Sequence, residues 1–137
     1  MSPAYDFFDH DADIGIVGRG TTLEAAFEAA AQAMFSIMID PGKLGRSSHL
    51  AFEFGENDVE LALVTWLNRL LAEARSHSLM LGAFKLVRSG DLWHGEAWGS
   101  PWSKGAEGGV EVKGATLTML SVRECDGAWE ARCVVDV

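Results

Sequence analysis

Apolar positions recur with two different periods along the chain, and the changes of period mark the predicted elements. Residues 5–8 and 14–17 are short apolar runs typical of strands, with an acidic loop between them. Over residues 23–38 the apolar positions recur every third or fourth residue, which predicts an amphipathic helix. Thr21 and Glu24 stand at capping-box spacing, so the helix is expected to begin there.

The remaining pattern predicts one strand, a second helix and then only strands. Asn57 and Glu60 form a second capping-box pair, and the helix that follows should run to about Arg75. Strands are expected over residues 50–54, 79–87, 92–98 and 110–122, followed by a hairpin that turns at Asp126-Gly127.

This order of elements predicts an α+β fold. We expect a two-layer sandwich, with a mostly antiparallel or mixed sheet and two amphipathic helices on one face. A two-residue turn at Asp126-Gly127 would place Arg123 opposite Glu130 and Cys125 opposite Ala128. A length of 137 residues suits one core, so residues 1–137 are expected to form a single domain.

Charge and composition narrow the classes of function. The net charge is −9, with 20 acidic and 11 basic residues, which argues against binding nucleic acid by neutralising phosphates. Contact with RNA is therefore expected to be indirect, whereas cations and basic protein surfaces suit an acidic chain. Cys125 and Cys133 form no metal or disulfide pattern, and no apolar run is long enough to span a bilayer. We expect a reduced, cytoplasmic protein with no membrane association.

The acidic loop is the first candidate for chemistry. Carboxylates at Asp9, Asp11 and Asp13 alternate along it, and such oxygen ligands suit a hard divalent cation. The spacing excludes an EF-hand, because Gly20 stands where that loop requires a glutamate. A solvated acidic turn without a ligand is the alternative interpretation.

The C-terminus is the second candidate. An apolar strand continues to the last residue, so the Asp136 side chain stands beside the free carboxylate of Val137. If this strand lies next to the one that begins at Asp13, three carboxyl groups share a small volume and would repel one another without a cation or a lysine. A frayed, solvated terminus is the alternative.

Lys113 is the third candidate, because an ammonium on a strand after a Gly-rich stretch could contact a phosphate. The alternative is a solvated lysine on a strand edge. His10, His49, His77 and His94 show no metal-ligand spacing, and the sequence reveals no Ser-His-Asp or Cys-His arrangement.

Taken together, the motifs resemble those of the archease family along nearly the whole chain. The most specific is the aromatic opening that leads into an Asp-His-x-Ala-Asp pattern. The matching segments are Tyr5–Ile16, Thr22–Phe27, Ala33–Phe35 with Met38, Trp66–Asn68, Gly95–Glu96, Glu111–Lys113 and Val135–Val137.

The resemblance implies an accessory protein rather than an enzyme. Its partner would be the RNA ligase that joins 3′-phosphate to 5′-hydroxyl ends in transfer RNA splicing and RNA repair, and that uses GTP. The accessory protein would promote guanylylation and multiple turnover of the ligase. The family's metal ligands fall on Asp13, Asp136 and the terminal carboxylate of Val137, and its required lysine falls on Lys113. Ca²⁺ is the expected cation, with Mg²⁺ and Mn²⁺ as alternatives.

The chain also departs from the family's pattern. Thr116-Leu117-Thr118 stands where Thr-Tyr-x is usual, Asp11 replaces a common threonine, and residues 98–109 are longer than usual. Lys104 in that stretch is a candidate second phosphate contact. Two other functions stay open: a metal-dependent phosphoesterase, and a binding module whose cation is only structural. The oligomeric state is not predicted.

Overall fold

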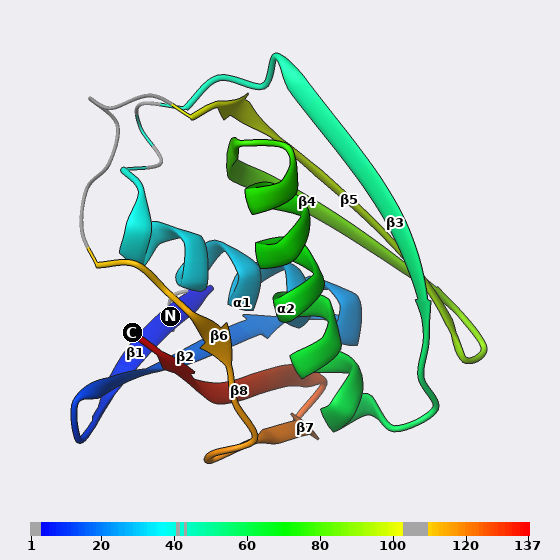
Figure 1. Cartoon of the computed structure of the whole chain (residues 1–137). Helices are drawn as coiled ribbons and strands as arrows, with labels where there is room; N and C mark the ends of the chain where they lie inside the picture. The colour runs from blue at the N-terminus through cyan, green and yellow to red at the C-terminus, as the bar shows by residue number, and fades with distance from the viewer. Residues whose placement is uncertain (1–3, 41, 43, 103–109) are drawn as a thin grey trace.

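The structure, a computed structural model, describes residues 4–40, 42, 44–102 and 110–137, and its elements combine two helices with two antiparallel sheets (Figure 1). The predicted α+β class is therefore confirmed, with the strands divided between two sheets. The elements are β1 (Tyr5–His10), β2 (Asp13–Gly20), α1 (Leu23–Met38), β3 (Ser48–Gly55), α2 (Val59–Ser76), β4 (Leu79–Ser89), β5 (Leu92–Pro101), β6 (Gly114–Ala115), β7 (Ser121–Cys125) and β8 (Ala128–Asp136).

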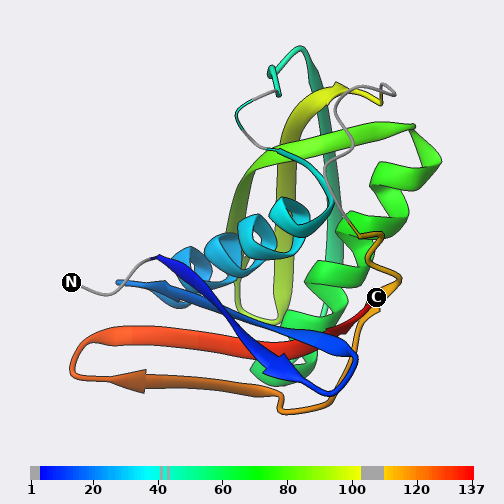
Figure 2. The same ribbon diagram turned by 90° about the vertical axis from the view of Figure 1, so that its left-hand side faces the viewer.

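The five-stranded sheet brings the two ends of the chain together. Its order is β1-β2-β8-β6, and β7 pairs with the same edge of β8 as β6 does. The three-stranded sheet has the order β3-β5-β4. Both helices lie on one face of the five-stranded sheet, and α1 contacts β2 and β8 of that sheet as well as β4 of the other (Figure 2).

Aromatic rings form the centre of the core between the helices and the three-stranded sheet. The Trp93 ring stacks on Phe27 and Phe54, with centroid separations of 5.5 and 5.8 Å. Trp66 is fully buried, and its indole Nε1 donates to the carbonyl oxygen of Phe27 at 3.0 Å. This bond satisfies the one polar atom that burial of the indole would otherwise leave unpaired. It also fixes α2 against α1.

Both helices begin one residue later than the capping-box spacing predicts. The N-cap of α1 is Thr22, whose hydroxyl accepts from the Ala25 amide at 3.0 Å. The N-cap of α2 is Asp58, whose carboxylate accepts from two amides of the first turn. The predicted caps Thr21 and Asn57 are therefore wrong, because in each case the adjacent side chain also carries an acceptor oxygen and takes the capping position.

The predicted strand over residues 110–122 is also wrong. The chain forms the two-residue β6 in that range and then turns, with Met119 at a φ of 56°, and β7 begins only at Ser121. The hairpin that follows is confirmed, since Arg123 pairs with Glu130 and the turn residues Asp126 and Gly127 have φ values of 53° and 78°. Positive φ at both turn residues is what a two-residue hairpin turn requires.

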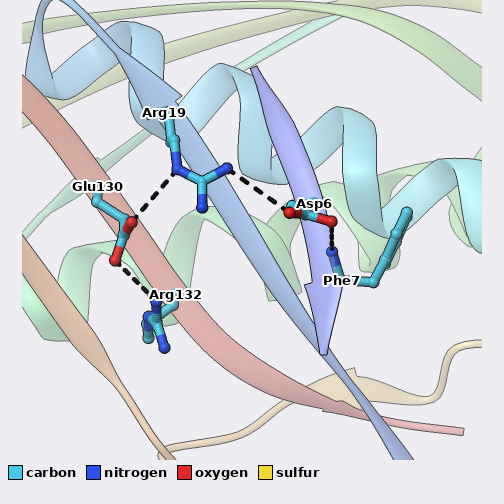
Figure 3. Close-up of polar contacts among 5 residues, drawn as sticks. All are labelled: Asp6, Phe7, Arg19, Glu130 and Arg132. Atoms are coloured by element: carbon cyan, nitrogen blue, oxygen red, sulfur yellow. Dashed lines mark hydrogen bonds and ion pairs between the residues drawn. The ribbon is translucent and has the colours of Figure 1, made fainter. Parts of the chain in front are cut away.

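Ion pairs join the three longest strands of the five-stranded sheet (Figure 3). Arg19 on β2 lies 3.9 Å from Asp6 on β1 and 3.3 Å from Glu130 on β8, and Arg132 donates to Glu130 at 2.9 Å. The Arg132 guanidinium also lies over the Phe8 ring, 5.5 Å from its centroid. Along β2 and β8 these side chains alternate with residues of the main core, such as Ile16, Ala131 and Cys133, so they lie on the face opposite the helices. They fix the alignment of the strands whose ends carry the candidate site.

Candidate functional site

Asp13 lies where the chain enters β2, next to the end of the chain. The β2–β8 ladder pairs Ile14 with Val135, and one further step along that register brings Asp13 opposite Asp136. The Asp13 carboxylate oxygen Oδ1 accepts a hydrogen bond from the Val137 amide at 3.3 Å. The sequence-based expectation that the last strand lies beside the one starting at Asp13 is therefore confirmed.

Lys113 lies at the same corner of the five-stranded sheet, where β2 begins and β8 ends, and it stands just before β6. Its amide donates to the Asp136 carbonyl at 2.7 Å, and the next residue, Gly114, pairs with Asp136 in the β6–β8 ladder. The side chains of Lys113 and Asp136 are exposed, whereas Asp13 and Val137 are half-buried. The structure thus brings all four predicted residues together, two of them at the surface.

A divalent cation at this corner would need oxygen ligands beyond the side chains that the structure describes there. Among the described residues, no group of three or more His, Cys, Asp or Glu side chains is arranged to hold a metal ion. The predicted donors are the carboxylates of Asp13, Asp136 and Val137, of which the structure places the Asp13 side chain against the Val137 backbone amide. Such hard oxygen donors fit Ca²⁺, Mg²⁺ or Mn²⁺ rather than a soft metal.

The rest of the acidic loop does not converge on this corner. Asp11 is exposed at the hairpin turn with a φ of 53°, a backbone conformation that aspartate tolerates better than threonine. His10 pairs with Asp13 across the hairpin, and its Nδ1 atom is buried without a hydrogen bond in the described part of the chain. Asp9 is exposed.

The departures from the family pattern lie close to the site. Leu117 and Thr118 are exposed in the turn between β6 and β7, and the Thr118 carbonyl accepts from the Val134 amide at 3.0 Å. The replacement of the usual tyrosine therefore concerns an exposed position close to Val134 of β8 and leaves the backbone pairing there in place. Lys104, the candidate second phosphate contact, lies outside the described residues.

Sequence reasoning missed the side chains of α2 that bind the backbone of residues 112–115, the segment that contains Lys113. Arg75 donates to the Val112 carbonyl at 2.6 Å, and the Asn68 amide both donates to and accepts from the backbone of Ala115. A mid-helix asparagine was the available signal, because Asn is a poor helix former and its amide competes for backbone groups. Its partner could not be read from the chain, since Asn68 and Ala115 are 47 residues apart.

A groove of about 450 Å³ opens beside the same segment. The C-terminal ends of α1 and α2 and the start of β4 form its walls, and the exposed Trp102 and Val110 lie on its lining with Arg75 and Glu111. It is mainly apolar, and its lining in the described part of the chain includes none of Asp13, Lys113, Asp136 and Val137.

The cysteines take no part in the site. Both are free thiols, and Cys125 is exposed whereas Cys133 is buried on β8. Burial raises the pKa of the Cys133 thiol to about 12, because desolvation disfavours the thiolate. Cys133 is thus a core residue. The expected pairing of Cys125 with Ala128 across the hairpin is confirmed.

The chain is similar to characterised families and structures along nearly its full length. Residues 5–137 match the Archease protein family (MTH1598/TM1083). The protein archease of Sulfolobus acidocaldarius is 36% identical, covering 97% of this chain and 98% of that protein. The protein archease of Pyrococcus furiosus is 32% identical, again covering 97% of this chain and 98% of that protein.

Solved structures share the fold. The solution structure of Methanobacterium thermoautotrophicum protein 1598 has a TM-score of 0.84 and 31% identity, covering 98% of this chain and 99% of that one. A crystal structure of an archease from Thermotoga maritima, described as a possible chaperone, has a TM-score of 0.68, covers 95% of this chain and 94% of that one, and is 16% identical. The second likeness therefore concerns the fold alone. No helix within the described ranges is both long and apolar enough to cross a membrane.

Proposed function

The chain belongs to the archease family, and we propose that it is an accessory protein that activates an RNA ligase without turnover of its own. The ligase would join RNA 3′-phosphate to 5′-hydroxyl ends in transfer RNA splicing or RNA repair. The accessory protein would promote the GTP-dependent guanylylation of that ligase and its multiple turnover. RNA would be contacted only indirectly, in keeping with the net charge of −9.

One observation carries the proposal: the corner at which the Asp13 carboxylate accepts from the Val137 amide is also the corner at which the Lys113 backbone amide donates to the Asp136 backbone carbonyl. Asp136 and Lys113 are exposed there, which suits insertion into another protein's site better than enclosure of a substrate.

In this mechanism the Lys113 ammonium is exposed toward the partner and contacts phosphate oxygens of the bound guanylate. Asp13, Asp136 and the Val137 carboxylate would hold a divalent cation, with Ca²⁺ favoured, and the bound cation would supply positive charge to the same phosphates. The hydrogen bond from the Val137 amide orients the Asp13 carboxylate. Lys113 and the carboxylates would therefore act on one charged group from adjacent strands.

The experiment that tests the proposal is a multiple-turnover ligation assay with the cognate ligase, GTP, Ca²⁺ or Mn²⁺ and RNA bearing 3′-phosphate and 5′-hydroxyl ends. We expect acceleration by the protein, loss of most of it in Lys113→Ala, and retention of it in Lys85→Ala, which removes an exposed lysine from the other sheet. Absence of acceleration by the unaltered protein at stoichiometric excess would contradict the proposal. RNA phosphate release by the protein alone would instead favour a phosphoesterase.

The role of the terminal carboxylate is tested separately. Addition of a Gly-Ser pair after Val137 moves the negative charge away from Asp13 while keeping the Val137 amide, so the affinity for Ca²⁺ measured by calorimetry should fall. Unchanged affinity would remove Val137 from the site. A cation that binds and stabilises the fold, with ligation stimulated equally without it, would make its role structural.

A further inference from the structure

Two side chains of α2 hold the backbone on either side of Lys113. Arg75 Nη2 donates to the carbonyl oxygens of Val112 at 2.6 Å and of Lys113 at 3.5 Å. Asn68 Nδ2 donates to the Ala115 carbonyl at 3.1 Å. Asn68 and Arg75 are separated by two helical turns, about 10 Å along α2, so they lie on the same face of the helix. That face runs along residues 112–115.

Asn68 does for β6 what a neighbouring strand would do. β6 has only two residues and pairs with β8 along one edge. On its other edge, the Asn68 side-chain oxygen accepts from the Ala115 amide at 2.9 Å, and its side-chain nitrogen donates to the carbonyl of the same residue. The primary amide thus reproduces both hydrogen bonds of a strand neighbour. Without it, these groups of Ala115 would lose their partners, and their burial would be costly.

The same segment is fixed to the candidate site from the β8 side. The Lys113 amide donates to the Asp136 carbonyl at 2.7 Å, and Val112, next to Lys113, is fully buried. Residues 112–115 are therefore bonded to α2 on one edge and to β8 on the other. A shift of this segment would move Lys113 relative to Asp136.

We propose that Asn68 and Arg75 are positioning residues, which set the place of Lys113 relative to the carboxylates of Asp13 and Asp136 by holding residues 112–115 against β8. This inference rests on the proposed function. Neither side chain touches the partner's phosphates in this account. They act through the backbone of the segment, where a displacement of about 1 Å is enough to cost up to 100-fold in rate.

A matched control separates positioning from general stabilisation. Arg69 lies on the same helix and donates to a backbone carbonyl, that of Glu53, at 3.3 Å, and its guanidinium lies 4.8 Å from the Phe52 ring centroid. These contacts fix α2 to the three-stranded sheet, away from Lys113. Arg69→Met therefore removes the same kind of hydrogen bond from the same helix and leaves residues 112–115 untouched.

The first test is independent of any ligase. Amide hydrogen exchange of Lys113 and Ala115, followed by NMR, should be at least tenfold faster in Arg75→Met and in Asn68→Ala than in the unaltered protein. It should be unchanged in Arg69→Met and intermediate in Arg75→Lys, which keeps one cationic donor. Unchanged exchange in both Arg75→Met and Asn68→Ala would show that β8 alone holds the segment, and would overturn the proposal.

The second test measures ligation at increasing concentrations of each variant, at a temperature where circular dichroism shows all of them folded. We expect Arg75→Met and Asn68→Ala to lower the maximal stimulation about 10- to 100-fold, with partial rescue by Arg75→Lys and no loss in Arg69→Met. Full stimulation by Arg75→Met and Asn68→Ala would overturn the positioning role. If the unaltered protein gave no stimulation, the proposed function would fail, and the exchange experiment would still judge whether α2 holds the segment.

Discussion

Replacement of Asp13 by asparagine separates the two roles that the structure gives its carboxylate. The side-chain oxygen accepts from the Val137 amide at 3.3 Å, and the negative charge is available to a cation. Asp13→Asn keeps an acceptor oxygen and removes the charge, whereas Asp13→Ala removes both. Asp9→Asn is the matched control, since it removes one negative charge from an exposed position of the same hairpin.

The expected magnitudes differ between the two roles. The hydrogen bond is long and only partly buried, so its loss in Asp13→Ala should cost about 0.5–1 kcal/mol of unfolding free energy. For a chain of 137 residues, this lowers Tm by roughly 2–4 °C. A cation present at about 100 times its Kd stabilises the folded state by about 2.7 kcal/mol, which should raise Tm by roughly 8–11 °C. Loss of one charged ligand costs about 2–5 kcal/mol of binding free energy, which would remove most of that rise.

The assay is thermal unfolding followed by circular dichroism, with EDTA or with Ca²⁺ at millimolar concentration. Without cation, Asp13→Asn should melt close to the unaltered protein and Asp13→Ala a few degrees lower. With Ca²⁺, the unaltered protein and Asp9→Asn should gain stability, whereas both Asp13 variants should gain little. An equal rise of Tm in Asp13→Asn and the unaltered protein would refute the assignment of Asp13 as a ligand.

Three further predictions concern the fold. A Cβ on Gly18 would lie 2.2 Å from the Ala26 carbonyl oxygen of α1, so Gly18→Ala should lower the unfolding free energy measured in urea by about 1–3 kcal/mol or more. Gly55→Ala is the control and should be close to neutral, because the nearest atom to its Cβ would lie 3.9 Å away. Equal effects of the two substitutions would contradict the close approach of β2 and α1. A thiol reagent at pH 8 should modify one cysteine rapidly, the exposed Cys125, and reach Cys133 only after unfolding; rapid modification of both would contradict the burial of Cys133. Burial raises the pKa of the Cys133 thiol from 9.0 to about 12, so the contribution of the neutral thiol to folding stability is complete below pH 9 and is lost as the pH rises toward 12. By pH 10.5 the unfolding free energy should have fallen by roughly 2 kcal/mol relative to that of Cys133→Ala. Parallel pH profiles of stability for the two proteins would contradict this.

Local patterns in the sequence were sufficient for the helices and the last hairpin. The apolar stripe of α1 and the Asp126-Gly127 turn depend on residues close together in the chain, where side-chain spacing and backbone preference decide the outcome. The helix starts were misplaced by one residue, because Thr21 and Thr22 both offer a hydroxyl and spacing alone does not choose between them.

Long-range pairing explains what the sequence did not reveal. The apolar residues after Val110 read as one strand, yet β8 takes β6 and β7 as separate partners along one edge. The placement of Lys113 depends on Asn68 and Arg75, and these side-chain contacts with the backbone leave no local periodicity. Asp13, Asp136 and Lys113 were candidates from their residue types and positions, and the family resemblance supplied their expected roles. The antiparallel pairing of β2 and β8 accounts for the meeting of Asp13 and Asp136, and the Lys113 amide joins them through the Asp136 carbonyl.

The corner formed by Asp13, Lys113 and Asp136 is proposed to promote guanylylation of a partner ligase. The rate at which that ligase forms its covalent guanylate tests this proposal most directly. The ligase would be mixed with radiolabelled GTP and a divalent cation under single-turnover conditions, with the unaltered protein, Lys113→Ala, Asp13→Asn or Lys85→Ala. We predict faster formation of the ligase–GMP adduct with the unaltered protein and Lys85→Ala, and little acceleration with folded Lys113→Ala or Asp13→Asn. Equal acceleration by all four proteins, or none by the unaltered protein, would contradict it.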